Sequence, residues 1–148
     1  MDNTFQLDII SLTRPAFSGK VESVTVPGSE GQMTVMRHHI PLITPLVSGE
    51  VVIHHGKEVT HFAISSGFLI VERDKVNLMV DSADRLEELD EEKIQEAKKR
   101  AEKLLAEKKF STDREFADAT AALEKSIAHL RVVKKHRTHR EGAAGGPE

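Results

Sequence analysis

The sequence predicts a β + α protein, in which an N-terminal antiparallel β-sandwich is followed by a C-terminal antiparallel hairpin of two helices. Three observations predict this class. Apolar residues alternate with polar ones at period two before residue 86, and they recur at helical spacing after residue 87. Glycine and proline occur up to Gly67 and again from Gly142, with none between, so the element type changes near Asp84–Asp90.

These changes divide the 148 residues into three parts. Residues 1–86 are the expected β-sandwich domain, residues 87–140 are the expected helical hairpin domain, and residues 141–148 are a tail of small residues that we expect to be disordered. The first part carries 7 Lys/Arg and 10 Asp/Glu, whereas the remainder carries 14 of each in fewer residues. Such dense mixed charge is typical of solvated helices.

Short strands are expected throughout the first part. In the first strand, Phe5, Leu7 and Ile9 face one side, and Gln6 and Asp8 face the other. Later strands are expected in the apolar or β-branched runs Val51–His55, Val59–Ser65, Phe68–Val71 and Val76–Val80. Turn residues separate these runs and no helix-length pattern lies between them, which favours antiparallel pairing.

Two helices with capped starts are expected in the second part. Their apolar stripes are Ile94, Ala97, Ala101, Leu104 and Leu105 in the first helix, and Phe116, Ala119, Leu123, Ile127 and Leu130 in the second. Asp90 is placed to cap the first helix, and Thr112 with Glu115 forms a capping box for the second. The short break Lys109–Ser111 makes the two helices antiparallel.

This hairpin offers little apolar area for its length. Each stripe is narrow and partly alanine, and isolated helices of this size are marginally stable in water. The hairpin must therefore dock on the sandwich or on a partner, and a shallow alanine-rich face suits docking that is reversible.

Composition argues against several function classes. There is no cysteine, which removes a disulfide scaffold, a cysteine-based zinc site and a thiol nucleophile. Tryptophan and tyrosine are absent and the net charge is −3, so no nucleic-acid partner is expected. The longest charge-free run, Val59–Val71, is too short to cross a bilayer, and the first residues lack the basic region of a signal peptide.

Five histidines of the first part suggest either a metal site or surface side chains. They are His38, His39, His54, His55 and His61. Adjacent residues on a strand point to opposite faces, so each doublet offers one ligand to any one site. Neither the HxH nor the HExxH spacing occurs. We therefore predict no metal site.

Asp81, Asp84 and Arg85 lie at the junction of the two parts. A pair of carboxylates is able to act in acid–base catalysis. No nucleophile–base pattern accompanies them, and the segment Pro27–Gly31 lacks the Lys-Ser/Thr of a phosphate-binding loop. An ion pair at the junction is the prediction.

A basic segment ends the second helix. Residues 131–140 contain five Lys/Arg and no acid. Three interpretations remain open: binding to an acidic protein surface, binding to nucleic acid or anionic lipid, and a solvated helix end whose cations complement the helix dipole.

Eight segments in fixed order, six of them taken in pairs, carry a resemblance to a known family. They are Leu7–Ser11 with Phe17–Glu22, Pro27–Gly31 with His39–Leu42, Ser65–Val71 with Val80–Arg85, Leu89-Asp90, and Ile127–Val132. With them the chain resembles the epsilon subunits of F-type ATP synthase, whose mitochondrial counterpart is called delta. The second pair is similar to the family pattern PGxxG…GHxPL, and the third to SGGxxxV…ADxAxR. Arg37-His38 replaces the usual Pro-Gly, and Ser66 replaces the first Gly of its pair.

The resemblance implies a part of the rotating central stalk that performs no chemistry and needs no cofactor. In the family the sandwich binds the gamma subunit and the c-subunit ring, and helps couple proton transport to ATP synthesis. By position, the ring-facing residues are Gly31, Gln32, His39, Ile40 and Pro41, and the gamma-facing residues are Ser11 and Thr44. The expected location is peripheral, on the cytoplasmic face of the plasma (inner) membrane, without transmembrane insertion.

The resemblance gives the hairpin a regulatory role. In an extended state it reaches the catalytic alpha/beta head and inhibits ATP hydrolysis. We expect the basic end, Arg131, Lys134, Lys135 and Arg137, to pair with acidic residues there.

Some family members resemble ATP sensors and carry an [IL]DxxRA motif. Here Leu89-Asp90 and Arg100 are kept, but Lys93 and Ile94 replace the motif's Arg and Ala. Lysine does not reproduce the bidentate guanidinium fork. We expect weak or no nucleotide binding at Asp90, Lys93 and Arg100. The alternatives are an ATP-sensing module on the same fold, a generic sandwich adaptor with a helical arm, and a free-standing metal-dependent sandwich enzyme.

Overall fold

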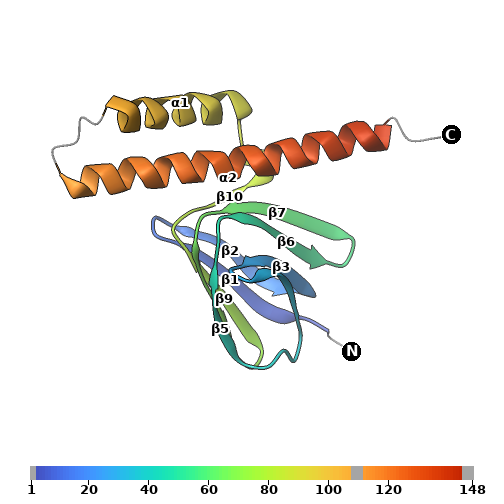
Figure 1. Ribbon diagram of the computed structural model, residues 1–148. Coiled ribbons are helices and arrows are strands. Elements are labelled where there is room, and N and C mark those ends of the chain that lie inside the picture. Colours follow the sequence, from blue (N-terminus) through green and yellow to red (C-terminus); the bar gives the residue numbers. More distant parts are fainter. Residues whose placement is uncertain (1–2, 108–111, 145–148) are drawn as a thin grey trace. The chain divides into compact units, whose positions relative to one another are not determined.

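The computed structural model describes residues 3–107 and 112–144, with side chains as far as His136 (Figure 1). The chain forms two compact units, Met1–Leu86 and Glu87–Glu148. We call them the β unit and the helical unit. Among the described residues, no helix is both long enough and apolar enough to span a membrane.

Ten strands build the described part of the β unit. They are β1 (Phe5–Ser11), β2 (Pro15–Val21), β3 (Ser23–Gly28), β4 (Gly31–Met36), β5 (Leu42–Leu46), β6 (Gly49–His55), β7 (Glu58–Ile64), β8 (Gly67–Val71), β9 (Lys75–Val80) and β10 (Ala83–Arg85). Their order in the sheet is β10-β7-β6-β3-β5-β8-β9-β1-β2, and β4 pairs with β3. The sheet curves around one core, as the strands of Figure 1 show, which confirms the predicted sandwich.

One strand pair departs from the antiparallel expectation. β1 runs parallel to β9, with Ile9 opposite Leu78 and Ile10 opposite Met79. Parallel neighbours need a long connection, and the seven strands between β1 and β9 provide one. Every other pair in the described sheet is antiparallel.

The core confirms the alternation read in the first and ninth strands. Phe5, Leu7 and Ile9 are almost fully buried, as are the inward residues of β9. The remaining core side chains come mainly from β3, β6, β7 and β8: Val24, Val26, Val51, Ile53, Phe62, Ile64, Leu69 and Val71. Burial of this apolar surface is the main force that stabilises the curved sheet.

The helical unit contains α1 (Glu91–Glu107) and α2 (Asp113–Ala144), which pack against each other, and a short 3-10 turn (Leu86–Glu88) precedes them. Both predicted caps are confirmed. The Asp90 carboxylate accepts the N–H of Glu92 at 3.0 Å, and the Thr112 hydroxyl accepts the N–H of Glu115 at 3.2 Å. The break expected at Lys109–Ser111 lies outside the described residues.

The two predicted apolar stripes are only partly covered. Leu104, Phe116 and Ile127 are exposed, while Ile94, Ala101 and Ala119 are buried. The second helix also continues to Ala144, into the segment predicted as a disordered tail. Extending an existing helix by a few residues costs little, since the nucleus is already formed. Residues 145–148 lie outside the described residues.

Candidate protein-binding site

Four apolar side chains lie in a row on the outer face of the sheet. Strand register places Pro45 opposite Phe68, Phe68 opposite Met79, and Met79 opposite Ile10. Phe68 is 54% exposed, Met79 50% and Ile10 42%. Opposed residues share a sheet face, so these four form one continuous surface across β5, β8, β9 and β1. We call Pro45, Phe68, Met79 and Ile10 the apolar row.

A shallow groove of about 450 Å³ runs along this row. Besides the apolar row it is lined by Ser11, Leu12, Leu46, Ser66, Gly67, Val80 and Asp81. Leu12 stands at its edge with 80% of its surface exposed. A groove with several large exposed apolar side chains is typical of a protein interaction surface.

Gly67 keeps the strands close at the groove. It pairs with Val80 across β8 and β9. A Cβ atom here would collide with the backbone oxygen of Met79 and would lie 2.7 Å from the Val80 Cα. Only glycine fits this approach, so Gly67 holds Phe68 and Met79 in register beside one another.

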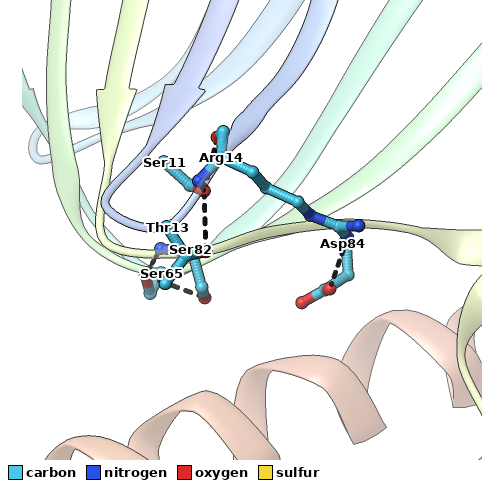
Figure 2. A network of polar contacts seen from close by, with 6 residues as sticks. All are labelled: Ser11, Thr13, Arg14, Ser65, Ser82 and Asp84. Carbon is cyan, nitrogen blue, oxygen red and sulfur yellow. Dashed lines mark hydrogen bonds and ion pairs between the residues drawn. The ribbon is translucent and has the colours of Figure 1, made fainter.

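Ser11, which lines the groove, makes hydrogen bonds within the turn that follows β1 (Figure 2). Its hydroxyl donates to the Arg14 carbonyl oxygen at 2.8 Å and accepts the Arg14 N–H at 3.3 Å. The Ser11 N–H donates to the same carbonyl at 3.0 Å. Ser11 is buried, and these bonds fix the turn between β1 and β2 that carries Leu12.

The predicted ion pair at the junction exists, but its cation comes from another element. Arg14 Nη2 lies 3.6 Å from Asp84 Oδ1 (Figure 2). Arg85 instead places its guanidinium over the Phe62 ring, 5.6 Å from the ring centroid. Asp81 is exposed at the groove. The separation of Arg14 from Asp84 along the sequence hid this pair from local patterns.

Ser65 and Ser82 join the segments next to this ion pair. The N–H of Ser82 donates to the Ser65 Oγ at 2.7 Å, and the N–H of Ser65 donates to the Ser82 carbonyl oxygen at 3.1 Å. These bonds, also drawn in part in Figure 2, hold the start of β10 to the end of β7. The junction is therefore built from backbone and hydroxyl contacts as well as from charge.

The two predicted gamma-facing residues occupy different positions. Ser11 lines the groove, whereas Thr44 shares the inner face of β5 and lies opposite the fully buried Leu69. Its neighbours Ile43 and Pro45 point outward instead. The sequence reading missed Ile10, Phe68 and Met79, although each breaks the alternation by placing an apolar residue beside an inward one.

The predicted ring-facing residues lie at the two ends of β4. Gly31 and Gln32 begin this strand, whereas His39, Ile40 and Pro41 follow its end. The His39 N–H donates to the Met36 carbonyl oxygen at 3.2 Å, which closes a turn directly after the strand. A strand of six residues separates the two groups by about 17 Å. The two groups therefore lie at opposite ends of β4 and do not form a single loop.

The histidines of the β unit lie on several of its segments. His54 and His55 are exposed at the end of β6, and His39 Nδ1 lies 2.8 Å from the Ile40 carbonyl oxygen. His61 Nδ1 lies 2.7 Å from Glu50 Oε1, across the β6–β7 pair. Within the described residues of the β unit, no three potential metal ligands lie together.

The residues considered for nucleotide lie on the first helix. The Asp90 carboxylate already accepts the backbone N–H of Glu92 and, at 3.4 Å, that of Lys93. Lys93 and Arg100 are exposed. Seven residues of helix separate these two cations by about 10 Å. The structure thus gives Asp90 a capping role.

The second helix presents a mixed face. Phe116, Leu123, Ile127 and Lys134 recur at helical spacing and lie on one side, with Phe116 53% exposed. Arg131, Lys134 and Lys135 are exposed. Arg137 belongs to α2, and its side chain lies outside the described residues. An apolar line that leads into a basic end is suited to a partly acidic protein partner.

The β unit is a curved β-sandwich with an exposed apolar row, and the helical unit is a capped hairpin with a basic end. Together they define a two-unit chain whose exposed surfaces suit contacts with other proteins. Two family models match it consecutively: the beta-sandwich domain of the ATP synthase delta/epsilon chain over residues 4–86, and the long alpha-helix domain of the same chain over residues 87–134. The chain belongs to the ATP synthase delta/epsilon family.

Curated relatives agree over nearly the whole length. The chain is 40% identical to the ATP synthase epsilon chain of Dehalococcoides mccartyi over 134 residues, which covers 90% of this chain and 95% of the relative. It is 38% identical to ATP synthase epsilon chain 1 of Methylococcus capsulatus over 141 residues, covering 95% and 99%.

Solved structures share the fold at lower identity. A chain in the cryo-EM structure of Euglena gracilis mitochondrial ATP synthase (OSCP/F1/c-ring) matches with a TM-score of 0.68 and 22% identity, covering 88% of this chain and 82% of that one. A chain of the Tetrahymena thermophila mitochondrial ATP synthase central stalk and c-ring matches with a TM-score of 0.54 and 12% identity, covering 86% and 95%.

Proposed function

We propose that this chain is a non-catalytic subunit of the central stalk of an F-type ATP synthase. In this role the β unit joins the gamma subunit to the c-subunit ring, turns with them, and couples proton transport to ATP synthesis. The chain then works at the cytoplasmic face of the plasma (inner) membrane as a peripheral subunit. Family membership supports the complex, and the apolar row supports the joint.

The apolar row carries this proposal. Three large apolar side chains stay about half exposed on a sheet whose inner face already holds a complete core. Covering such a row with a partner surface removes apolar area from water, at roughly 25 cal/mol for each Å². A joint that transmits torque needs an interface of roughly 1,600 Å², of which the groove and row form a natural centre.

The c-subunit ring is proposed to contact the residues at the two ends of β4. Gly31 and Gln32 at the start of β4, with His39, Ile40 and Pro41 after its end, are exposed or half-buried. Ile40 is 73% exposed, so a partner gains by covering it. The outward residues Gln32, Thr34 and Met36 connect the two groups along β4.

Co-expression with the gamma subunit tests the joint. We expect the two chains to elute together in size-exclusion chromatography and to stay together at raised salt, because an apolar interface is little screened. Elution of the full-length chain alone, at concentrations well above micromolar, contradicts the stalk assignment.

We further propose that the helical unit inhibits ATP hydrolysis from an extended state, in contact with the catalytic alpha/beta head. The exposed Phe116 and Ile127 and the basic residues Arg131, Lys134 and Lys135 support this, because they form an unburied mixed face on one helix. Changing a hairpin from mostly retracted to mostly extended takes about 5.5 kcal/mol of differential binding. Apolar docking and several charge pairs together reach that order.

Truncation tests the inhibitory role. Removal of residues 88–148 should leave proton-driven ATP synthesis coupled and should raise ATP hydrolysis by the assembled enzyme. An unchanged rate of ATP hydrolysis contradicts the inhibitory role and leaves the proposed joint between gamma and the ring unaffected.

ATP sensing is the second candidate function, and we propose that ATP binds weakly or not at all. Asp90 is engaged as a helix cap, and Lys93 stands where the family motif has arginine. Isothermal titration of the isolated chain with ATP should show no heat of binding at micromolar concentration. A micromolar affinity favours the sensor instead.

A further inference from the structure

Strand β4 has a side with no neighbouring strand in the described sheet. It pairs with β3 along its whole length, from Gly31 opposite Gly28 to Met36 opposite Ser23. The sheet order of the described residues gives it no second partner. We call the side of β4 that faces away from β3 the β4 edge. A free edge exposes backbone N–H and C=O groups to which another strand can bind.

The contacts of β3 show which backbone groups of β4 point to this edge. The Pro27 carbonyl oxygen accepts the N–H of Val47, directly after β5, at 2.9 Å. Backbone groups alternate in direction along a strand, so those of Gly28 point the other way and meet those of its partner Gly31. The same alternation on β4 turns outward the backbone groups of Gln32, Thr34 and Met36.

The two end strands of the described sheet carry features that hinder pairing with another chain. β2 contains Pro15 and the exposed Lys20, and its register with β1 shifts beside Ile10. β10 has three residues, of which Asp84 and Arg85 are charged. In contrast, β4 has six residues without a proline or a charge, in unbroken register with β3. Such an unprotected edge favours the addition of a strand.

The β4 edge is complementary to itself. The outward side chains Gln32, Thr34 and Met36 are exposed and uncharged, so two copies meet without repulsion between like charges. In an antiparallel pair centred on Thr34, the N–H of each Thr34 reaches the carbonyl oxygen of the other. Gln32 then lies opposite Met36 of the second copy, and the Met36 N–H reaches the Gln32 carbonyl oxygen. One symmetric arrangement therefore satisfies the outward groups of both copies.

We propose that the free chain forms a two-fold dimer, in which two β4 edges pair antiparallel with Thr34 opposite Thr34. The sheet then continues from one copy into the other, and each copy protects the edge of its partner. The proposal does not rest on the stalk function. Gln32 is also proposed to face the ring, so the dimer belongs to the chain before assembly. A pair of short strands is a small interface, and such interfaces bind weakly.

Sedimentation equilibrium of the isolated full-length chain tests the dimer. We expect the average mass to rise from the monomer value toward the dimer value between about 10 μM and about 1 mM, as for a weak interface. A chain that remains monomeric at about 1 mM overturns the proposal. Oligomers that grow beyond the dimer also overturn it, because a two-fold pair is closed.

Substitutions at Thr34 test the role of the backbone. Thr34→Pro removes the outward N–H, which makes no bond to β3, and should weaken dimerisation at least about 10-fold. Thr34→Val is the matched control: both changes remove the hydroxyl contact with Thr25 at 2.9 Å, but valine keeps the N–H and should dimerise as the unsubstituted chain does. Circular dichroism should show that both variants fold.

Thr34→Lys keeps the backbone and provides a second variant. Two ammonium groups would meet at the two-fold axis, so dimerisation should again weaken, and raised salt should restore part of it. Dimerisation of Thr34→Lys equal to that of Thr34→Val overturns the proposed register, whether or not Thr34→Pro folds.

Crosslinking locates the interface, because the chain has no native cysteine. Thr34→Cys should give a covalent dimer with a short bismaleimide, whereas Lys20→Cys, exposed on the end strand β2, should stay monomeric. Equal crosslinking at both positions, or crosslinking only at position 20, places the interface elsewhere and overturns the proposal. Co-elution with gamma is measured separately, so the dimer and the stalk function succeed or fail independently.

Discussion

Met79 lies directly opposite Ile10 in the parallel pair of β9 and β1, and both side chains are about half exposed. This relationship joins the first strand of the chain to the ninth and completes the apolar row. It places apolar side chains on the outer face of a sheet whose inner face is already filled. Exposure of this apolar surface to water is unfavourable, and a partner that covers it makes the free energy more favourable.

A charge within the apolar row should break the joint with gamma. Met79→Asp places a carboxylate in the middle of the proposed interface, where burial without a partner cation costs several kcal/mol, so co-elution should be lost. Val59→Asp is the matched control, since Val59 is 47% exposed on β7, away from the row. Retained co-elution of Met79→Asp at equal folding, by circular dichroism, contradicts the assignment of this face.

Gly67→Ala should destabilise the β unit. The added methyl meets the Met79 backbone oxygen and the Val80 Cα, and backbone atoms in a paired strand have little room to move. We expect a loss of about 1–3 kcal/mol in the free energy of unfolding, from denaturant titration. Gly19→Ala serves as the control, because its Cβ would meet only the Phe17 ring at 3.6 Å. Equal stability of both variants contradicts the close approach at Gly67.

His38→Gly should stabilise the β unit. At φ of +66° glycine has no steric penalty, and the relief outweighs its larger unfolded-state entropy by about 0.5–1 kcal/mol. The same change at His55, an exposed residue at the end of β6, should lower stability by a similar amount. Chemical denaturation of both variants measures the difference. A stability loss at position 38 places the residue outside the left-handed region.

Asp8 should make stability depend on acid. The Ser18 hydroxyl donates a hydrogen bond to the Asp8 carboxylate at 2.6 Å and lowers the pKa of Asp8 below its ordinary value of 3.8. Gln6 and Lys75 lower this pKa further. A lowered folded-state pKa stabilises the protein above pH 3.8, and the contribution is lost as the pH falls through the folded value.

Asp8→Asn removes that contribution. At neutral pH it should cost under about 1 kcal/mol, because the group is near the surface, and well below pH 3.8 the two proteins should converge. Glu30→Gln, in the exposed β3–β4 turn, is the control. A difference that stays constant across this range argues that Asp8 acts through packing instead.

Local sequence patterns predicted the structural features that depend on residues close together in the chain. Asp90 and Thr112 were identified as caps from residues within four positions, and Phe5, Leu7 and Ile9 as core from alternation alone. The parallel β1–β9 pair and the contact of Arg14 with Asp84 join distant segments, which local patterns do not encode. Phe116 lies on the apolar stripe predicted for the second helix and is exposed. The hydrophobic pattern identifies an apolar face of a helix, but it does not say which partner covers that face.

The residues assigned to partners by their position in the family pattern remain predictions. Ser11, predicted to face gamma, lines the groove, and its hydroxyl donates a hydrogen bond to the Arg14 carbonyl oxygen in the turn. Thr44 lies on the inner face of its strand, and the outward Pro45 belongs to the apolar row. A one-residue change along a strand exchanges its faces, so a site assigned by position in a family pattern is easily displaced by one residue.

Charge reversal at the end of α2 should release inhibition while leaving the joint intact. Arg131, Lys134 and Lys135 are exposed and are proposed to pair with acidic residues of the catalytic head. Replacing all three by Glu turns attraction into repulsion, and like charges facing one another at an interface cost several kcal/mol. ATP hydrolysis by the assembled enzyme should therefore rise toward that of the truncated chain, while co-elution with gamma stays unchanged. The matched control reverses Lys99, Arg100 and Lys103 on α1, which changes net charge equally and should leave hydrolysis low. If both triple variants raise hydrolysis alike, total charge rather than the end of α2 sets the inhibition.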